Sequence, residues 1–575
     1  MARSRASSDH AQYGVVVLGS GPAGQRAAIA SVKSGRRTLM IEKRAVVGGV
    51  CINTGTIPSK SFREAVVYLS GYREQALYGE SYAVKREITM DDLNARATYV
   101  MKRERDVIQA QAYRNGIDLV YGAASFVDPQ TIHIQLADGF GTRTVSAETI
   151  VIATGSEVAQ VGDIAFDGQR ILNSETILTM TDIPRTLTVV GAGVVGCEYA
   201  SMFAALGTRV TLVDARPALL PFVDREIADE LAHHLRSRWV TLRLGEELKT
   251  CALLPDGRVK TVLASGKVIV TEKTLHAIGR EGATADLNLA AAGLTADKRG
   301  KMTVNEHYQT ATPHIYAVGD VVGFPALAST SMGQGRIAAS HAAHMPVNLM
   351  PGVFPYGIYA IPELSMVGKT EEELTGANVP YEVGKAYYRH VARGQIIGDS
   401  AGMLKILFCP SAHTIFGVHI IGENAAELVH IGQAVMALGG TIEYFVDAVM
   451  NYPTLSELYK IAAHNGLNRL AGEAAGALAD LPATESPVAA VTGGDRRGDA
   501  PRHCRGEGRR DRRGDGACAR RGPEWDEGIT RACAVPYPQQ RPLRTRQRRW
   551  RRRGAAVCTA RCLFPRRWST PSRHS

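Results

Sequence analysis

Residues 13–42 read YGVVVLGSGPAGQRAAIASVKSGRRTLMIE, and this stretch decides how the first part of the chain folds. The apolar run from Tyr13 to Leu18 predicts a buried strand. Gln25 to Ser34 has the pattern of a helix, and Arg37 to Ile41 predicts a second strand. Strand, glycine turn, helix and strand in this order predict a Rossmann-like βαβ unit.

The glycines of this stretch have separate roles in such a unit. Gly19 permits the tight turn, Gly21 lets the backbone approach a pyrophosphate, and Gly24 allows the helix to pack closely on the strand. The helix N-terminus offers N–H donors to phosphate oxygens. Glu42 ends the second strand, where a carboxylate can hold ribose hydroxyls. The stretch therefore predicts a dinucleotide site.

The same pattern occurs a second time. Residues 187–190 lead into a glycine turn, a helix follows through Ala205, and residues 209–213 lead to Asp214. Chance glycines in buried strands are the alternative, but both units are complete to the acid, so we expect two bound dinucleotides. The apolar run 187–207 also suggests a membrane span, yet Glu198 and the glycines favour a buried strand, turn and helix. The glycines of this second turn are Gly191, Gly193 and Gly196.

Composition predicts a soluble, cytoplasmic globular protein. The 575 residues are 45% hydrophobic and 21% charged, and residues 1–12 lack the apolar segment of a signal peptide. The cysteines of the main body are widely spaced, which favours a reducing compartment. The chain is long enough for several domains. Its sequence shows no pattern that predicts a metal site.

The charge is concentrated near the C-terminus. Residues 495–575 contain 23 Arg, no Lys and 8 acidic residues, a net charge of +15. The whole chain carries +11, so subtracting this segment leaves −4 for residues 1–494. An Arg-rich segment can bind nucleic acid through phosphates. Because this segment lacks apolar periodicity, however, we expect residues 473–575 to be a disordered, removable tail. The codon bias of a shifted reading frame also fits the composition of the segment. A nucleic-acid partner is not expected.

Residues 48–60, GGVCINTGTIPSK, resemble the redox stretch of the flavoprotein disulfide reductases. In that family two cysteines five positions apart form a disulfide against the flavin. Cys51 is present here, but Thr56 stands at the second position. Because a hydroxyl can neither form a disulfide nor act as a thiolate, the dithiol relay is chemically excluded.

Further segments resemble the same family in the same order. Residues 151–156, with Thr154 and Gly155, look like the strand that returns from the flavin domain, and residues 315–320 look like the second flavin motif. Residues 277–280, with Gly279, match the close of the nicotinamide domain, and Pro362 opens a match to the dimerisation domain.

The resemblance, over about residues 12–471, implies an α/β fold with two Rossmann-like dinucleotide-binding domains, one for FAD and one for NAD(P), and an α+β C-terminal dimerisation domain. It implies a homodimer or higher homo-oligomer. The expected domains are FAD-binding in two parts, 1–155 and 285–345; NAD(P)-binding, 156–284; dimerisation, 346–472; and the tail, 473–575.

The resemblance also implies roles for individual residues. Lys60 matches a lysine near flavin N5 and Glu198 its ion-pair partner, and a cation there stabilises negative charge during hydride transfer. Asp320 matches the residue that reaches the ribityl chain. Val194 replaces a tyrosine that covers the flavin in some relatives. The other residues assigned to FAD are Lys43, Gly48, Gly49 and Cys51.

A second departure from the disulfide reductases lies at Tyr452. The family histidine that shuttles protons to the thiol is replaced in Asn451-Tyr452-Pro453-Thr454, although Glu457 remains. With a pKa near 10, tyrosine is a poor shuttle at neutral pH. Both departures resemble the flavin-dependent pyridine nucleotide transhydrogenases of this family, which implies FAD-dependent hydride transfer between NADPH and NAD⁺. The alternatives are an NAD(P)H reductase of quinones or other small acceptors, and a catalytically silent nucleotide sensor.

Asp214 and Arg216 predict a nicotinamide site that accepts both NAD(H) and NADP(H). The carboxylate favours a free 2′-hydroxyl, and the guanidinium two positions on can reach a 2′-phosphate. A solvated ion pair between the two side chains is the alternative.

Overall fold

The computed structural model describes residues 10–479, except 80, 140, 161 and 163. The first glycine unit folds as expected, and its helix begins at Pro22, three residues before the predicted start. Its strands lie in a parallel layer of order β3–β2–β1–β5–β16, which β4 extends through antiparallel pairing with β3 and β5. These strands are β1 (His10–Leu18), β2 (Thr38–Glu42), β3 (Asp118–Asp128), β4 (Thr131–Leu136), β5 (Thr142–Ile152) and β16 (Ile315–Ala317).

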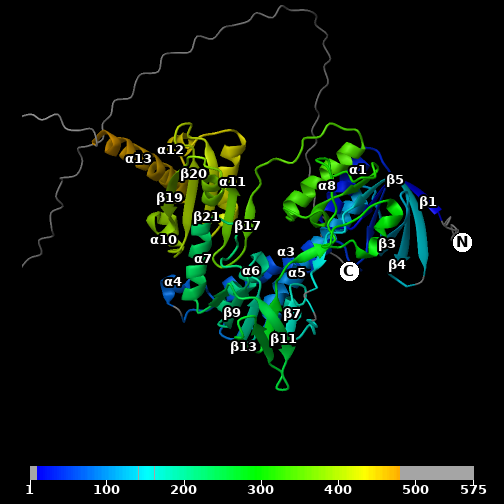
Figure 1. The fold of residues 1–575 in the computed structure, drawn as a ribbon, viewed down its shortest axis with the longest axis horizontal. Helices are drawn as coiled ribbons and strands as arrows, with labels where there is room; N and C mark the ends of the chain where they lie inside the picture. The colour runs from blue at the N-terminus through cyan, green and yellow to red at the C-terminus, as the bar shows by residue number, and fades with distance from the viewer. Residues whose placement is uncertain (1–9, 80, 140, 161, 163, 480–575) are drawn as a thin grey trace, which may run out of the picture. The chain divides into compact units, whose positions relative to one another are not determined.

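Helices α1 (Pro22–Lys33) and α8 (Ala328–Ala342) lie together against this sheet (Figure 1). Small buried residues of both helices, Ala27 and Ala338 among them, let the helices approach the strands closely. Short 3₁₀ helices η2 (Ala285–Leu287), η3 (Leu289–Ala292) and η4 (Gly319–Val322) accompany the return of the chain to β16. The first sheet is thus completed by a segment about 160 residues after β5, as the order of the motifs predicts.

The second glycine unit forms a parallel sheet of order β10–β9–β8–β14–β7. Strand β8 is almost wholly buried, which explains its unbroken apolar run and confirms strand, turn and helix over 187–207 rather than a membrane span. Elements of this part are β7 (Ile171–Asn173), β8 (Thr186–Val190), β9 (Arg209–Asp214), β10 (Thr241–Leu244), β14 (Lys273–His276), α6 (Val194–Ala205), α7 (Arg225–Ser237), η1 (Ile177–Thr179) and the antiparallel β11 (Leu248–Leu253), β12 (Val259–Leu263) and β13 (Val268–Thr271).

A two-stranded ribbon and a group of helices connect the glycine units. The ribbon pairs β6 (Ser156–Val158) with β15 (Arg280–Gly282). Helix α3 carries Phe62 and Val66 into one apolar core with Phe203 of α6, so the two helices are packed against each other. This packing places Lys60 next to Glu198. The helices are α2 (Gly49–Asn53), α3 (Thr56–Leu69), α4 (Gln75–Tyr78) and α5 (Met90–Arg114).

The C-terminal part is α+β. Its antiparallel sheet has the order β17–β18–β21–β20–β19, and α11 and α13 pack on it. Helix α13 continues to Ala479, seven residues past the boundary expected at 472; the remainder of the predicted tail lies outside the described residues. The elements are β17 (Tyr356–Ile358), β18 (Leu364–Gly368), β19 (Glu382–Tyr387), β20 (Met403–Phe408), β21 (Ile415–Ile421), α9 (Glu371–Gly376), η5 (Tyr388–His390), α10 (Ala392–Ile396), α11 (Ala425–Ala437), α12 (Glu443–Asp447) and α13 (Glu457–Ala479).

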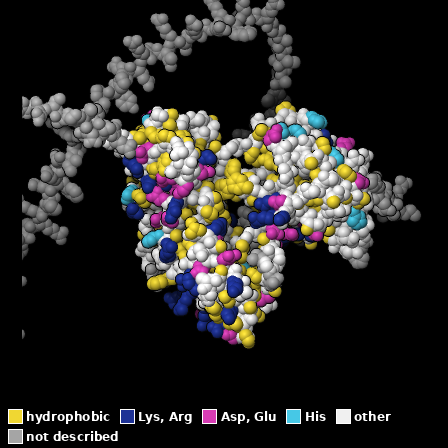
Figure 2. Space-filling model, viewed as in Figure 1, with side chains coloured by type: hydrophobic (Ala, Val, Ile, Leu, Met, Phe, Trp, Pro, Cys, Tyr) yellow, Lys and Arg dark blue, Asp and Glu magenta, His cyan; other side chains and the backbone are white. Residues whose placement is uncertain are grey.

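Within the described residues, every helix is too short or too polar to cross a membrane. Acidic, basic and hydrophobic side chains are interspersed over the described part of the face shown in Figure 2.

Candidate functional site

The first glycine turn opens onto a cavity of about 620 Å³. Gly19 has φ +107°, and a Cβ on Gly24 would lie 1.9 Å from the Gly19 carbonyl oxygen, so both positions require glycine. A Cβ on Gly21 would meet no atom within 4 Å, because this residue faces the open cavity. Gly21 is also the N-cap of α1 and makes no side-chain capping bond, which leaves the helix N–H groups free for an anion.

Polar groups on the cavity wall suit a dinucleotide. Glu42 is buried and accepts hydrogen bonds from the Ser20 N–H (3.1 Å), the Arg44 N–H (2.8 Å) and the Ser20 hydroxyl. Thr154 Oγ1 is buried and lacks a protein partner in the described part of the chain, so a ligand can satisfy it. Lys43 pairs with Asp286 (2.6 Å) at the exposed rim. The donors and the glycine cradle together fit FAD.

The redox stretch enters the same cavity through Gly49, Cys51 and Thr56. Gly48 is the N-cap of α2 and has φ +106°, and a Cβ there would lie 2.6 Å from Ile52. Cys51 is a free thiol. Burial raises the pKa of this thiol, while a hydrogen bond with the Thr56 hydroxyl partly opposes the rise. Cys51 is therefore a neutral thiol near pH 7 and has no second sulfur with which to pair at Thr56.

Lys60 and Glu198 form a buried ion pair between the two glycine units. Lys60 Nζ lies 2.7 Å from each carboxylate oxygen of Glu198, whose side chain is only 3% exposed. The Tyr359 N–H donates to the same carboxylate (2.9 Å), and Lys60 Nζ lies 5.0 Å from the centre of the Tyr359 ring. The pair is therefore fixed in position by hydrogen bonds and a cation–π contact.

A second cavity, of about 550 Å³, lies at the second glycine turn. Gly191 has φ +108°, and a Cβ on Gly196 would lie 1.7 Å from the Gly191 carbonyl oxygen, as in the first turn. Gly193, Val194 and Gly279 also line this cavity. His276 lies there too, although no sequence motif marks it; burial lowers its pKa to about 4, so the ring is neutral at pH 7.

Asp214 and Arg216 form a close ion pair in the second cavity. Arg216 Nε lies 2.8 Å and Nη2 2.6 Å from the two oxygens of Asp214, which also accept from the N–H groups of Arg216 and Ala192. Burial raises the pKa of Asp214, but these hydrogen bonds outweigh it and hold the pKa below its usual range. Because Asp214 takes two of the five guanidinium N–H donors, three remain for a ligand.

Asp320 lines the first cavity, in agreement with the expected return of the chain to that site. Its carboxylate accepts a hydrogen bond from Ser156 (2.8 Å), and Ser156 in turn accepts one from Arg280. Glu175 holds the other side of Arg280 (3.0 Å). Sequence reasoning missed Glu175, which lies in no recognisable motif.

Two residues from the altered proton-shuttle segment lie apart from these contacts. Tyr452 is 74% exposed on the single chain, and Glu457 begins α13, where it accepts a long hydrogen bond from the Thr454 N–H (3.4 Å). Their side chains line neither cavity.

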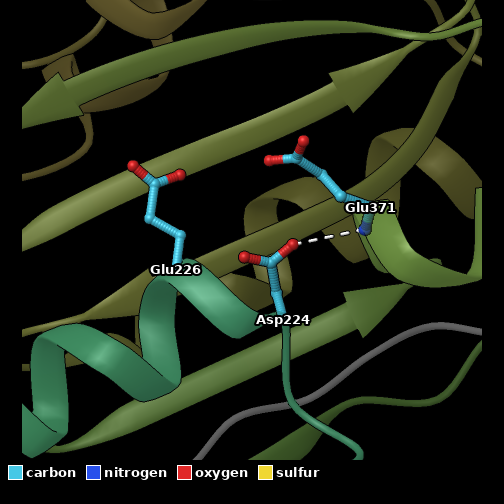
Figure 3. A group of neighbouring side chains, drawn as sticks. All are labelled: Asp224, Glu226 and Glu371. Atoms are coloured by element: carbon cyan, nitrogen blue, oxygen red, sulfur yellow. Dashed lines mark hydrogen bonds between the residues drawn. The ribbon is translucent and has the colours of Figure 1, made fainter. Parts of the chain in front are cut away.

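One acidic cluster lies outside both cavities. Asp224, Glu226 and Glu371 bring carboxylate oxygens within 4.8 Å of one another (Figure 3). Lys405, a buried residue, contacts all three carboxylates through its ammonium group, which lies 2.8 Å from Asp224 and 3.1 Å from Glu226. A protein cation thus already occupies the position that a metal ion would take.

Both cavities lie in a part of the chain that matches a known protein family. Residues 13–335 match the pyridine nucleotide-disulphide oxidoreductase family, and residues 354–463 match the dimerisation domain of that family. The chain belongs to the pyridine nucleotide-disulphide oxidoreductase family. The predicted α/β fold is thereby confirmed.

Named relatives of the same family are similar over nearly their whole length. A soluble pyridine nucleotide transhydrogenase of Mycobacterium bovis is 51% identical over 459 residues, 80% of this chain and 98% of the relative. One from Colwellia psychrerythraea is 45% identical over 463 residues, 80% of this chain and 98% of the relative. Among solved structures, LpdA of Mycobacterium tuberculosis superposes with a TM-score of 0.73 at 25% identity, covering 79% of this chain and 99% of LpdA.

Proposed function

We propose that this pyridine nucleotide-disulphide oxidoreductase is an FAD-dependent NAD(P)⁺ transhydrogenase, which catalyses NADPH + NAD⁺ ⇌ NADP⁺ + NADH and so balances the two nicotinamide pools in the cytoplasm. The observation that carries the proposal is the contact of Cys51 with Thr56 in the first cavity. No dithiol can receive electrons there, so a hydride taken from one nicotinamide must leave on another acceptor. The relatives named as transhydrogenases support a second nicotinamide as that acceptor.

The proposed division of labour follows the two cavities. FAD, held by the first glycine turn, Glu42 and Asp320, would supply the hydride carrier when bound. Nicotinamide nucleotides would use the second cavity in turn, with the pyrophosphate at the N-terminus of α6 and the adenosine ribose near Asp214 and Arg216. Val194 lines this cavity with a small side chain, which leaves the nicotinamide end open.

Lys60 and Glu198 supply the electrostatic part of the proposal. The Lys60 ammonium is held by two short contacts to Glu198 and cannot swing into solvent without leaving a buried carboxylate unpaired. A cation fixed in this way stabilises negative charge that develops beside it and needs no reorganisation during transfer. Glu198 positions the lysine, since a further hydrogen bond, from the Tyr359 N–H, anchors the carboxylate.

The protein is also proposed to act as a homodimer or higher homo-oligomer. Residues 354–463 match a dimerisation domain, and two apolar residues near its C-terminal helix, Val449 (98% exposed) and Tyr452 (74% exposed), are uncovered on the single chain. Sedimentation of a stable, active monomer would contradict this part of the proposal.

An anaerobic titration separates the proposed activity from the alternatives. NADPH should bleach the yellow colour of the purified protein, and NAD⁺ should restore it. Recovery with a quinone but not with NAD⁺ would instead support a reductase of small acceptors. A colour that NADPH leaves unchanged would point to a silent nucleotide sensor and refute the catalytic proposal.

A further inference from the structure

Ser156 lies between a cation of the second cavity and a carboxylate of the first. Arg280 Nε donates to the Ser156 hydroxyl oxygen (2.9 Å), and Arg280 Nη2 donates to the Ser156 carbonyl (2.7 Å). The same hydroxyl lies 2.8 Å from Asp320 Oδ2. Arg280 lines the nicotinamide cavity, whereas Ser156 and Asp320 line the flavin cavity.

The donor groups available set the hydrogen-bond directions in the series Arg280–Ser156–Asp320. Arginine has donors and no acceptor, so the Ser156 oxygen must accept from Arg280. The single O–H of Ser156 is then directed away from Arg280 and donates to Asp320 Oδ2. Donation from the Ser156 O–H stabilises negative charge on Oδ2, so this arrangement favours the carboxylate over the acid.

Glu175 holds Arg280, which begins this series of hydrogen bonds. One of its oxygens accepts from Arg280 Nη2 (3.0 Å), and the other lies 3.3 Å from Nη2 of Arg44, which lines the flavin cavity. Arg280 and Glu175 are each only about one quarter exposed, at 23% and 24%. Two partners on Arg280 fix the guanidinium plane, and its Nε–H keeps the Ser156 O–H directed away from Arg280, toward Asp320.

We propose that Arg280 is a positioning residue that acts through Ser156 to keep the Asp320 carboxylate turned and charged as a hydrogen-bond acceptor for the bound flavin cofactor, and that Glu175 positions Arg280. This inference rests on the proposed function only in taking FAD to occupy the first cavity. It assigns to Arg280 a second role on the flavin side, besides its place on the wall of the nicotinamide cavity.

The charges around Asp320 make the role measurable. Burial raises the pKa of Asp320, and Ser156, Arg280 and Lys301 of the η3–β16 segment oppose the rise. A further titratable neighbour is Cys51 of α2, a neutral thiol. Loss of Arg280 removes one cation and frees the Ser156 hydroxyl to rotate, so the pKa of Asp320 must rise further. Protonation of Asp320 on acidification then begins at a higher pH in the variant.

The test is the FAD dissociation constant as a function of pH, measured by the fluorescence of released FAD on the full-length protein. We expect Arg280→Met to weaken FAD binding about tenfold or more near pH 6, with less effect near pH 8. Glu175→Gln should shift the profile in the same direction by a smaller amount. Arg299→Met removes a neighbouring exposed arginine whose contact is the Arg280 carbonyl oxygen (3.4 Å), and it should leave the profile unchanged.

A double-mutant cycle separates positioning from general damage. Asp320→Asn should bind FAD weakly with little pH dependence, and adding Arg280→Met should then have little further effect, because the two changes act through one carboxylate. If Arg280→Met fails to fold, Ser156→Ala removes the hydroxyl that links Arg280 to Asp320. It should shift the pH dependence of FAD binding in the same direction. Profiles that superpose on wild type, or fully additive losses in the cycle, would overturn the inference. Wild-type protein that binds no FAD at all would instead refute the proposed function.

Discussion

Replacing Arg216 by alanine should weaken the binding of NADPH much more than the binding of NADH. In the structure, Arg216 uses two N–H donors on Asp214 and has three left, and its side chain is 47% exposed at the second cavity. These donors can hold a 2′-phosphate while the pair with Asp214 stays intact. NADH has no such phosphate, so it loses no contact of this kind in the variant.

The size of the effect follows from these contacts. A hydrogen bond to a charged group contributes about 1.5–3 kcal/mol, and we take about 1.5–2 kcal/mol because a half-exposed guanidinium is screened by solvent. This corresponds to roughly a 10- to 30-fold weaker NADPH complex. The variant also leaves the Asp214 carboxylate without its cation, which adds repulsion toward a phosphate. The dissociation constant of NADH should change by less than about threefold, because Asp214 still accepts a hydrogen bond from the Ala192 N–H and can hold a 2′-hydroxyl.

Anaerobic stopped-flow bleaching of the protein colour measures this directly. The concentration dependence of the bleaching rate gives a dissociation constant for NADPH and, separately, for NADH. Arg209→Ala is the matched control, since Arg209 is an exposed arginine at the opposite end of the same strand, β9. Equal losses for the two nucleotides would show that Arg216 does not read the phosphate, and the argument for dual specificity would fail with it.

Three further predictions concern Cys51, Lys60 and the kinetics of the two nicotinamides. Cys51→Ser should keep transhydrogenase turnover within about threefold, because the thiol is neutral and has no sulfur partner; a loss of several orders of magnitude would show that the thiol takes part in the chemistry. Lys60→Met should lower the rate of hydride transfer by about 10²–10³, in the range for one preorganised donor, with Lys60→Arg retaining more of it in single-turnover measurements. Initial-rate lines for NADPH and NAD⁺ should be parallel, because both nucleotides are proposed to use one cavity in turn, whereas intersecting lines would indicate two separate sites.

Much of the fold could be predicted from sequence because the glycines have backbone causes. Gly24 and Gly196 each lie against the carbonyl of the first glycine of their own turn, so the pattern reports a close approach that other residues cannot make. The strands around them are buried on both faces and read as unbroken apolar runs. Sequence position also predicted that β16 would return to the first sheet.

The contacts between segments far apart in sequence could not be predicted in the same way. Glu175 reaches Arg280 and Arg44 across more than a hundred residues on either side, and neither its neighbours nor its spacing signal this. His276 likewise ends β14, a buried strand whose sequence Lys-Thr-Leu-His matches no site motif. Helix α13 continues to Ala479 because the small and apolar residues past 472 keep helical propensity, which a boundary set by motif matching ignores.

The two departures from the disulfide reductases have a single chemical consequence. Reduction of a disulfide by NADPH consumes a proton and delivers two thiols, so it needs both a dithiol relay and a proton donor. Thr56 removes the first and Tyr452 the second. Exchange between NADPH and NAD⁺ is balanced without any proton, so it needs neither group. In the proposed mechanism the charged pair Lys60–Glu198 would serve hydride transfer itself, and this chain keeps the pair in a buried, hydrogen-bonded arrangement. A site that keeps this charged pair but lacks the dithiol and the proton donor is unsuited to disulfide reduction. It has the groups that hydride exchange between nicotinamides would need.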